Sequence, residues 1–390
     1  MPVRLAHLVS HPIHYQAPLY RELASRPEVD LTVYFYSDAS VRGYHDLEYG
    51  REVRWDTPLL EGYRSRFLPS AARTGIQAPY GAAPNLDVLR EVLSDGYDTI
   101  WIHGYAHVNA WLAAAGAPFR RARVLIREEQ TLLHERPWYK AALKEVALRT
   151  LFARAYGLYI GEQNRRYFLR YGLAEERLFP ARYCVDNAFF RRRAEELRPR
   201  RDELRAAFGI ADPALPVILY VGKLIPKKAP LVLVEAFARV RERTPCALLI
   251  VGEGELRPAV KELVAARGIP DVYLAGFLNQ QELPAAYVSA DIFCLPSVLR
   301  ETWGLVVNEA LNFELPVVVS DKVGCAADLV RPGGNGFVVP AGEPEPLAGE
   351  LEILVADEQM RRDFGRRGLE LVDGYSIESC ADGIVAACLA

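Results

Sequence analysis

The sequence predicts two doubly wound α/β domains, each built on a mostly parallel sheet. Three observations lead to this fold class. The 390 residues exceed what one ordinary hydrophobic core accommodates. Short apolar runs alternate with helical patterns in both halves, as in strand-helix-strand units. The alternation breaks once, over 180–205, and then restarts. We therefore expect domains at 1–200 and 201–376, followed by a last helix over 377–390.

In the first half, apolar runs predict strands at 3–10, 30–38, 99–104, 123–129 and 157–162. Helical spacing predicts helices at 17–25, 85–96, 107–115 and 138–156. Residues 39–85 follow neither pattern and are rich in Tyr, Arg, Gly and Pro. Ordered loops of this length are usually functional, so we expect 39–85 to shape a binding site, together with the loops at 11–16 and 127–137.

In the second half, strands are predicted at 216–224, 246–255, 271–277, 292–295, 316–319 and 336–340. Helices are predicted at 230–243 and 258–267, the second closed by Gly268. In doubly wound folds, ligands collect at the carboxyl ends of the strands. The loops that follow these strands are therefore the first place to look for chemistry.

The most informative stretch runs from Ala290 to Asp321, where a loop and a helix separate two of the predicted strands. Gly304 stands where the helix should start, and Glu301 and Glu309 flank that start with seven residues between them. A helix N-terminus presents unpaired N–H groups and partial positive charge, which suits a phosphate. Glu309 can accept two hydrogen bonds from a vicinal diol such as a ribose.

This pattern resembles the E-x7-E signature of the retaining glycosyltransferases of family 4, which have the GT-B fold. The likeness also includes Ala290-Asp291, Leu295-Pro296-Ser297, Glu301-Thr302-Trp303-Gly304, Asn308-Glu309-Ala310 and Leu315-Pro316-Val317. The resemblance implies two Rossmann-like domains facing across a cleft, the first for the acceptor and the second for the nucleotide sugar. It also implies that the last helix crosses back to the first domain.

One residue inside this motif departs from the family. Glu314 stands where the family usually has glycine before Leu-Pro. Because a positive φ suits glycine better than glutamate, we expect either a slightly different turn or a φ that is not positive.

Cations follow the first strand of the second domain, in Gly222-Lys223-Leu224-Ile225-Pro226-Lys227-Lys228. This run resembles the family's GRLxxxK, with Lys223 at the Arg position and Lys228 at the Lys position. Lysine loses the bidentate fork of arginine but keeps its charge. The resemblance implies that Lys223, Lys228 and Glu301 act in catalysis by stabilising the leaving diphosphate. The remaining residues that it implies for donor binding are Gly222, Gly252, Phe277, Leu278, Gly304, Leu305 and Glu309.

Polar residues at strand ends of the first domain are candidates for acceptor binding: His11, His14, His103, Arg127 and Glu129. Histidines in loops are often structural, so ligand contact and a structural role stay open for His11 and His14. A salt bridge between Arg127 and Glu129 is an equal alternative to a catalytic role.

Composition narrows the class of protein. The six cysteines lack metal-type spacing, and we read those in strand runs as buried thiols of a reducing compartment. No metal or other cofactor is expected, since the lysines can neutralise the diphosphate, and no nucleic-acid partner is expected. No apolar run reaches the ~18–20 residues of a membrane span. The N-terminus does not read as a signal peptide, so a cytoplasmic location is expected.

Charge is uneven along the chain. Residues 120–205 carry 21 Lys or Arg against 12 Asp or Glu. The basic segment 138–156 has two interpretations: an ordinary surface helix, or a contact with the inner face of an anionic membrane or with a lipid-linked acceptor.

The sequence thus predicts a retaining glycosyltransferase that moves a sugar from a nucleotide diphosphate, expected to be UDP, to a hydroxyl of a glycan, a lipid-linked sugar or a small molecule. A nucleotide-sugar 2-epimerase of the same fold and a non-catalytic nucleotide-sugar-binding subunit remain as alternatives. The absence of GxGxxG after either first strand argues against a dinucleotide-dependent oxidoreductase.

Overall fold

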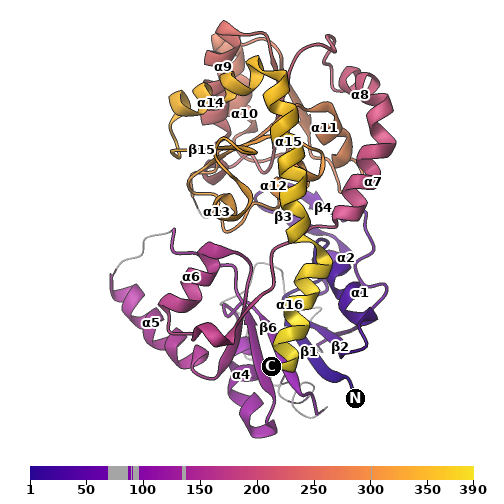
Figure 1. Cartoon of the computed structure of the whole chain (residues 1–390), viewed down its shortest axis with the longest axis vertical. Helices are drawn as coiled ribbons and strands as arrows, with labels where there is room; N and C mark the ends of the chain where they lie inside the picture. Colours follow the sequence, from indigo (N-terminus) through magenta and orange to yellow (C-terminus); the bar gives the residue numbers. More distant parts are fainter. Residues whose placement is uncertain (69–86, 89, 91–95, 134–137, 300) are drawn as a thin grey trace. The chain divides into compact units, whose positions relative to one another are not determined.

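A computed structural model describes residues 1–68, 87–88, 90, 96–133, 138–299 and 301–390 (Figure 1). Its contacts divide the chain into two compact units. The first contains Met1–Tyr44, Val53–Cys184 and Ser376–Ala390, and the second contains His45–Glu52 and Val185–Tyr375. The second unit begins well before Arg200, because α7 (Asn187–Leu197) and α8 (Arg201–Ala207) pack on helices of that unit.

The first unit is built on a parallel sheet, for which the described residues supply seven strands. Their order is β5 (Arg64–Phe67), β2 (Val29–Phe35), β1 (Val3–Val9), β6 (Thr99–His103), β7 (Arg123–Arg127), β8 (Ala155–Tyr159) and β9 (Leu178–Pro180). The description of 39–85 as irregular is wrong for three short elements over 39–53 and for β5. That strand lies at the sheet edge with mostly exposed, charged side chains, so it lacks the apolar alternation that marks a strand.

Helices cover both faces of this sheet. On one face, α1 (Ala17–Ser25) and α16 (Ile377–Leu389) enclose a core that includes Leu5, Trp101 and Ile384. On the other, α4 (Val108–Gly116), α5 (Trp138–Phe152) and α6 (Glu162–Arg170) enclose a core that includes Ile100 and Phe168. Most of the helix predicted at 85–96 lies outside the described residues.

The second unit is built on another parallel sheet, with six strands in the described part. Their order is β12 (Val272–Gly276), β11 (Ala247–Val251), β10 (Val217–Val221), β13 (Ile292–Leu295), β14 (Val317–Ser320) and β15 (Gly336–Val339). The chain order reverses between β10 and β13, and in open α/β sheets ligands bind outside the carboxyl ends of the strands at such a point. The prediction of two doubly wound domains with mostly parallel sheets is confirmed.

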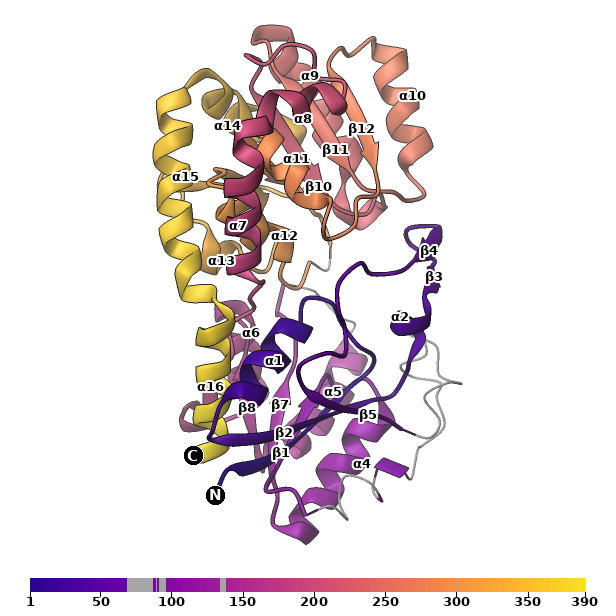
Figure 2. The same cartoon turned by 90° about the vertical axis from the view of Figure 1, so that its right-hand side faces the viewer.

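Two helical layers flank this sheet (Figure 2). In one, α9 (Pro230–Arg243) packs on α10 (Arg257–Arg267) and α14 (Pro344–Ala356). In the other, α12 (Leu305–Asn312) packs on α7 and α15 (Glu358–Val372), and α11 (Leu283–Ser289) packs on α7 and α8. Shorter helices are α2 (Ala39–Arg42) and α13 (Ala326–Leu329), and a hairpin pairs β3 (Tyr44–Asp46) with β4 (Arg51–Val53).

Glu314 adopts a φ of 58°, so the expectation that it avoids a positive φ is wrong. It follows the C-cap of α12, and Leu315 N donates to Ala310 O in the bond that closes a left-handed helix end. Its carbonyl also packs on α15, where a Cβ at Gly365 would lie 2.0 Å from Glu314 O. The side chain forms an ion pair with Arg198. Glutamate therefore keeps the turn that glycine makes more readily.

Candidate active site

The loops after β10, β11 and β12 are in close contact, and only glycine fits between them. A Cβ at Gly252 would lie 1.9 Å from Gly222 O, and Gly252 has a φ of 142°. The amide of Gly252 donates to Gly276 O at 2.7 Å. Phe277 and Leu278 follow at once, so the glycines, Phe277 and Leu278 from the predicted donor side lie at one sheet edge.

Lys228 and Glu301 are brought together by the two central strands. Lys228 ends η5 (Pro226–Lys228), in the connection after β10, and Glu301 lies in the loop after β13. Their side chains form an ion pair, with 15% and 13% of each exposed. Ser297 Oγ also donates to Glu301 Oε2, at 3.1 Å. Ser297 was quoted in the sequence motif without a role, and its contact identifies it as the residue that orients Glu301.

The loop that carries Glu301 is fixed by backbone contacts. Gly324 N donates to Glu301 O and Cys325 N donates to Trp303 O, both at 3.0 Å. The indole Nε1 of Trp303 donates to Asn308 Oδ1 at 2.8 Å, which ties the loop to α12. Gly324 has no room for a side chain, because a Cβ would lie 2.0 Å from Thr302 O.

Substitution of Gly324 by alanine should therefore disrupt the site. The added methyl must displace backbone rather than a flexible side chain, and we expect a loss of about 1–3 kcal/mol in the free energy of unfolding. Gly349→Ala is the matched control, since a Cβ at this position of α14 meets nothing within 4 Å. The control should be neutral or more stable, by up to ~1 kcal/mol. Urea unfolding of both variants measures the difference, and equal stability would contradict the described loop packing.

Glu309 is a buried carboxyl on α12. Its side chain accepts a hydrogen bond from Tyr287 Oη at 2.7 Å, and Tyr287 stacks on Phe313 at 5.0 Å between ring centroids. Burial raises the pKa of Glu309 to about 7, although the Tyr287 hydrogen bond lowers it in part. Near neutral pH, Glu309 thus exchanges between a carboxylic acid and a carboxylate. Tyr287 was missed, since it belongs to the apolar pattern of α11 and nothing in the sequence links it to Glu309.

The start of α12 is suited to an anion. Gly304 is its N-cap with a φ of 100°, and it supplies no side chain to cap the first-turn N–H groups. Leu305 is the first helical residue, so these amides follow the Glu301 loop directly. The partial positive charge of the helix end favours a negative group at this position.

Lys223 pairs with two acids other than Glu301. Its Nζ lies 3.0 Å from Asp46 Oδ2 and 2.7 Å from Glu48 Oε2. Burial raises the pKa of both acids, but hydrogen bonds, from Tyr49 N to Asp46 and from Lys223 to Glu48, bring each pKa below its ordinary value. The sequence analysis assigned no role to either acid, because their contacts to Lys223 join positions about 175 residues apart.

In the first unit, His103 and Glu129 come together at the ends of β6 and β7. His103 Nε2 lies 3.2 Å from Glu129 Oε1, and Tyr183 Oη donates to the same carboxylate. Burial raises the pKa of Glu129, but the hydrogen bond with His103 helps to bring it below its ordinary value. Arg127 is buried and donates to Ala181 O at 3.3 Å, so the partner of Glu129 is His103 rather than Arg127.

The two loop histidines are partly buried and neutral. His11 Nδ1 lies 2.9 Å from Ser10 Oγ, and burial lowers the pKa of His11 to about 4. His14 stacks on Trp55 with 3.7 Å between ring centroids, and burial lowers its pKa to about 3. Glu128, which precedes Glu129 in the chain and was not predicted as a site residue, is also buried: burial raises its pKa, and it accepts from Tyr105 N at 3.3 Å.

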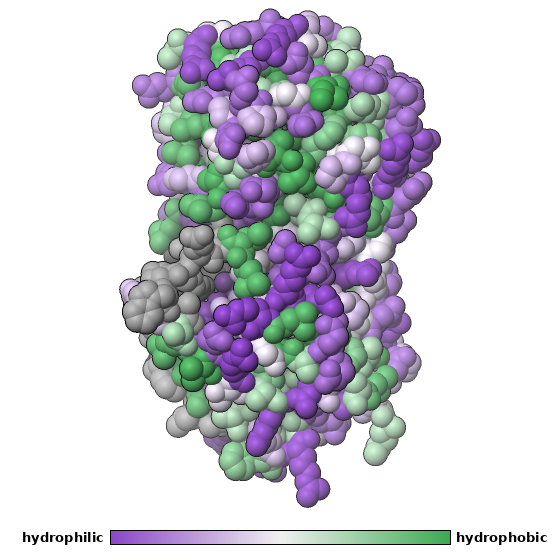
Figure 3. Space-filling view, turned by 60° about the vertical axis from the view of Figure 1, so that its left-hand side comes forward, coloured by the Kyte–Doolittle hydropathy of each residue, from purple (hydrophilic) through white to green (hydrophobic). Residues whose placement is uncertain are grey.

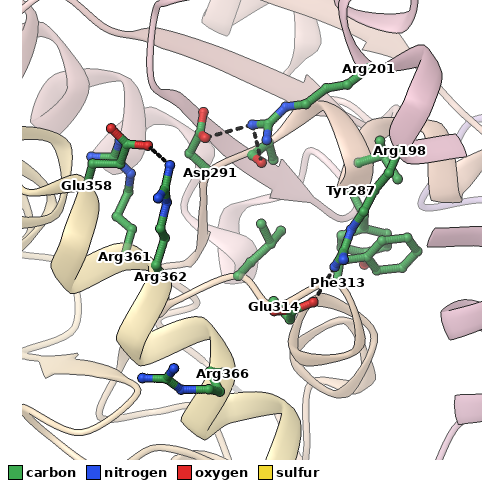
Figure 4. Close-up of a pocket in the computed structure, with 13 residues that line it drawn as sticks. Arg198, Arg201, Tyr287, Asp291, Phe313, Glu314, Glu358, Arg361, Arg362 and Arg366 are labelled. Atoms are coloured by element: carbon green, nitrogen blue, oxygen red, sulfur yellow. Dashed lines mark hydrogen bonds and ion pairs between the residues drawn. The ribbon is translucent and has the colours of Figure 1, made fainter. Parts of the chain in front are cut away.

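A pocket of about 430 Å³ lies elsewhere in the second unit (Figure 4). Asp291 and Leu315 place it at the amino ends of β13 and β14, away from the carboxyl ends that carry Lys228 and Glu301. Its charged walls are joined in pairs, such as Arg201 with Asp291 at 2.7 Å and Arg362 with Glu358. These pairs give the pocket a structural explanation, and it borders the candidate active site at Tyr287, the hydrogen-bond partner of Glu309.

The comparison with protein families finds a match for the second unit. Residues 201–370 match the family model described as Glycosyl transferases group 1. The match covers less than half of the chain and lies within the second unit. This segment contains Lys223, Lys228, Glu301 and Glu309, and the prediction that the protein is a glycosyltransferase is confirmed.

Named relatives support the same class. An alpha-D-kanosaminyltransferase of Streptomyces kanamyceticus is 28% identical over 302 residues, which cover 71% of this chain and 74% of that protein. A D-inositol 3-phosphate glycosyltransferase of Nocardia farcinica is 36% identical over 47% of this chain and 42% of its own length. The chain thus spans less than half the length of this second relative.

Solved glycosyltransferases share the whole fold. A glycosyltransferase from Rickettsia africae superposes with a TM-score of 0.77 at 15% identity, over 100% of this chain and 99% of its own. Anabaena HepE in complex with UDP gives a TM-score of 0.73 at 18% identity, over 99% of each chain. At these identities the likeness concerns the fold, and the predicted GT-B fold class is confirmed.

Proposed function

We propose that this glycosyltransferase belongs to the retaining family 4 enzymes and transfers a sugar from a UDP sugar to a hydroxyl group of a glycan, a lipid-linked sugar or a small molecule. The observation that carries the proposal is the contact between Lys228 and Glu301 at the switch point of the second sheet. The start of α12 and Glu309 follow on the same segment. This arrangement combines cations and helix amides for a diphosphate with an acceptor for a ribose diol.

The reaction follows from the charges that it creates. Breaking the bond between sugar and diphosphate leaves negative charge on the departing phosphate and an oxocarbenium-like sugar. Lys223, Lys228 and the first-turn amides of α12 would stabilise that phosphate, which is why the proposed reaction requires no metal ion. The resemblance to family 4 further implies that the acceptor hydroxyl attacks the sugar on the face from which the leaving group departs. The leaving phosphate then takes the proton of that hydroxyl.

Two observations support a UDP sugar as the donor. Anabaena HepE, which shares the fold, was crystallised with UDP and with UDP-glucose. In this chain, Phe277 and Leu278 follow β12 at the same sheet edge as the cationic loop, and the resemblance to family 4 implies that the nucleobase binds at this turn. Glu309 would then accept the ribose hydroxyls as a carboxylate.

We further propose that the acceptor binds to the first unit. His103 and Glu129 form a hydrogen-bonded acid and imidazole pair at adjacent strand ends, with His11 and Arg127 on the neighbouring loop and strand. An acceptor hydroxyl could donate to Glu129 or accept from His103. Variants at these two positions should therefore change the KM for the acceptor more than the KM for the donor.

A membrane-bound acceptor is favoured by the surface of α5. Tyr139, Leu143 and Val146 on this helix are 55%, 76% and 68% exposed, and their spacing places them on one side of the helix. In Figure 3, which brings the left-hand side of Figure 1 forward, hydrophobic and hydrophilic residues are mixed over the surface. Within the described residues, every helix is too short or too polar to cross a bilayer. We propose that α5 contacts the inner face of a membrane, where lipid-linked acceptors are presented.

A screen of nucleotide sugars for thermal stabilisation tests the proposal. A ligand at 100 times its dissociation constant adds about 2.7 kcal/mol to the free energy of unfolding. We expect UDP-glucose or another UDP sugar to raise the Tm, and GDP sugars to have a smaller effect. Stabilisation by no nucleotide sugar would contradict the proposal. Mass spectrometry of the stabilising nucleotide sugar, incubated with and without acceptors, separates transfer from 2-epimerisation and from binding alone.

A further inference from the structure

The hairpin His45–Glu52 contacts the cationic loop after β10. Although it comes from the first half of the sequence, its contacts place it in the second unit. Asp46 and Glu48 both pair with Lys223, and Glu48 also lies 3.6 Å from Lys227. Lys223 Nζ further lies 4.5 Å from the centroid of the Tyr49 ring. The two carboxylates thus neutralise Lys223, one of the two lysines that the proposed function assigns to the diphosphate.

The same hairpin covers Phe277. Tyr49 meets the Phe277 ring edge to face at 5.2 Å, and the guanidinium of Arg51 lies 4.7 Å above that ring. Under the proposed function, Lys223 binds the donor diphosphate and the turn at Phe277 meets the nucleobase. One short hairpin therefore places acidic groups where the phosphates of the donor would bind and an aromatic ring where its base would bind.

The turn is built to present its carboxylates. Asp46 Oδ1 accepts from Glu48 N and from Tyr49 N, both at 2.9 Å, which fixes the backbone that carries Glu48 and Tyr49. The Asp46 side chain is only 9% exposed, whereas that of Glu48 is 46% exposed. Leu47, at the tip between them, is 71% exposed and leaves the hairpin without an apolar anchor there. Charge and ring contacts thus hold the hairpin on Lys223.

We propose that the hairpin His45–Glu52 is a built-in competitor of the donor: it occupies Lys223 and Phe277 when no nucleotide is bound, and the nucleotide sugar displaces it. The proposal rests on the proposed function, because it takes Lys223 as a diphosphate ligand. Its consequence is that the apparent association constant for the donor equals the intrinsic constant multiplied by the fraction of molecules whose hairpin is open.

The double variant Asp46→Asn with Glu48→Gln tests this competition. Asparagine keeps the Oδ1 acceptor that fixes the turn, and both changes remove only the charges that bind Lys223. Since partly exposed ion pairs are individually weak, we expect the variant to bind UDP about tenfold more tightly than the native protein. Isothermal titration with UDP measures the two dissociation constants, and the KM for the UDP sugar should fall by the same factor.

Glu52→Gln provides the matched control. Glu52 is an exposed acid of the same hairpin, so its neutralisation changes the charge by one and leaves the contacts of Lys223 with Asp46 and Glu48 in place. The control should bind UDP as the native protein does. Equal or weaker binding of UDP by the double variant, beside measurable binding by the native protein, would overturn the competitor role and leave the proposed function standing. No binding of UDP or GDP by any of the proteins would overturn both.

Displacement can also be observed directly. All six native cysteines are buried, so a Leu47→Cys variant offers one exposed thiol for an environment-sensitive dye. Saturating UDP should change the emission of the dye, and in the double variant the emission before UDP should already resemble the displaced state. Emission that stays constant while titration reports UDP binding would contradict displacement.

Discussion

Replacement of Lys228 by alanine should lower the turnover number about 100- to 1,000-fold, the usual cost of removing one preorganised group that stabilises developing negative charge. Lys228 lies within the second unit's switch point with 15% of its side chain exposed, so its charge is poorly screened by water. Its carboxylate partner Glu301 would hold the ammonium in place while the diphosphate departs. The loss should appear in kcat with saturating donor, because the charge to be stabilised grows in the transition state.

Lys261→Ala is the control for this substitution. Lys261 is an exposed lysine of α10 in the same unit, so its removal changes the charge equally at a distance from Glu301. Both variants should be assayed with a donor and acceptor that work for the native enzyme, after circular dichroism has shown native helix content. Turnover by Lys228→Ala within threefold of the Lys261→Ala value would remove Lys228 from the mechanism.

Affinity for UDP-glucose should rise as the pH increases through about 7. Burial raises the pKa of Glu309 to about 7, and the proposed ribose contact needs the carboxylate. Below pH 7 the carboxyl must lose a proton before it accepts both ribose hydroxyls, so each pH unit below 7 should weaken binding about tenfold. We expect a dissociation constant about tenfold larger at pH 6 than at pH 8, measured by titration calorimetry. The diphosphate of UDP-glucose is fully esterified at both ends and does not titrate in this range.

Two variants separate Glu309 from other titrating groups. Glu309→Gln should bind UDP-glucose about 10- to 100-fold more weakly at pH 8, since it loses hydrogen bonds to a charged group, and its affinity should no longer follow this pH profile. Tyr287→Phe removes the hydrogen bond that lowers the Glu309 pKa, so the midpoint should move to higher pH. A pH profile that Glu309→Gln leaves unchanged would show that Glu309 does not contact the donor.

The raised pKa of Glu309 should also make the stability of the folded protein depend on pH. The pKa of Glu309 lies at about 7 in the folded protein, against an ordinary value of 4.5. Between these values the folded state binds more protons than the unfolded state, so this group makes stability fall as the pH rises from about 4.5 to about 7. The penalty is then constant at higher pH, and the ligand-binding profile above reports the same titration.

The strands and the helix that position the donor-binding residues could be predicted from the sequence, because each is marked by a pattern of neighbouring residues. β10 and β13 are short apolar runs that end in polar loops, and the start of α12 is marked by Gly304. The contact between Lys228 and Glu301 follows from these elements, since adjacent parallel strands end at the same edge. Resemblance to one family then supplied roles that spacing alone does not.

The features that could not be predicted from the sequence depend on tertiary contacts. The hairpin acids pair with Lys223 although about 175 residues separate them in the sequence, and no local pattern encodes that pairing. Tyr287 looks like any buried aromatic residue of a helix until Glu309 is found beside it. β5 carries charged, exposed side chains, and Glu314 adopts a conformation that its type disfavours. In each case a neighbour in space decides what the residue does.

The most direct test of the central claim is a crystal structure of the protein with UDP-glucose bound. We predict that the diphosphate lies against Lys223, Lys228 and the first-turn amides of α12, with the ribose hydroxyls on Glu309 and the hairpin acids withdrawn from Lys223. A diphosphate bound elsewhere, with Lys228 still paired only to Glu301 and Glu309 only to Tyr287, would contradict the account.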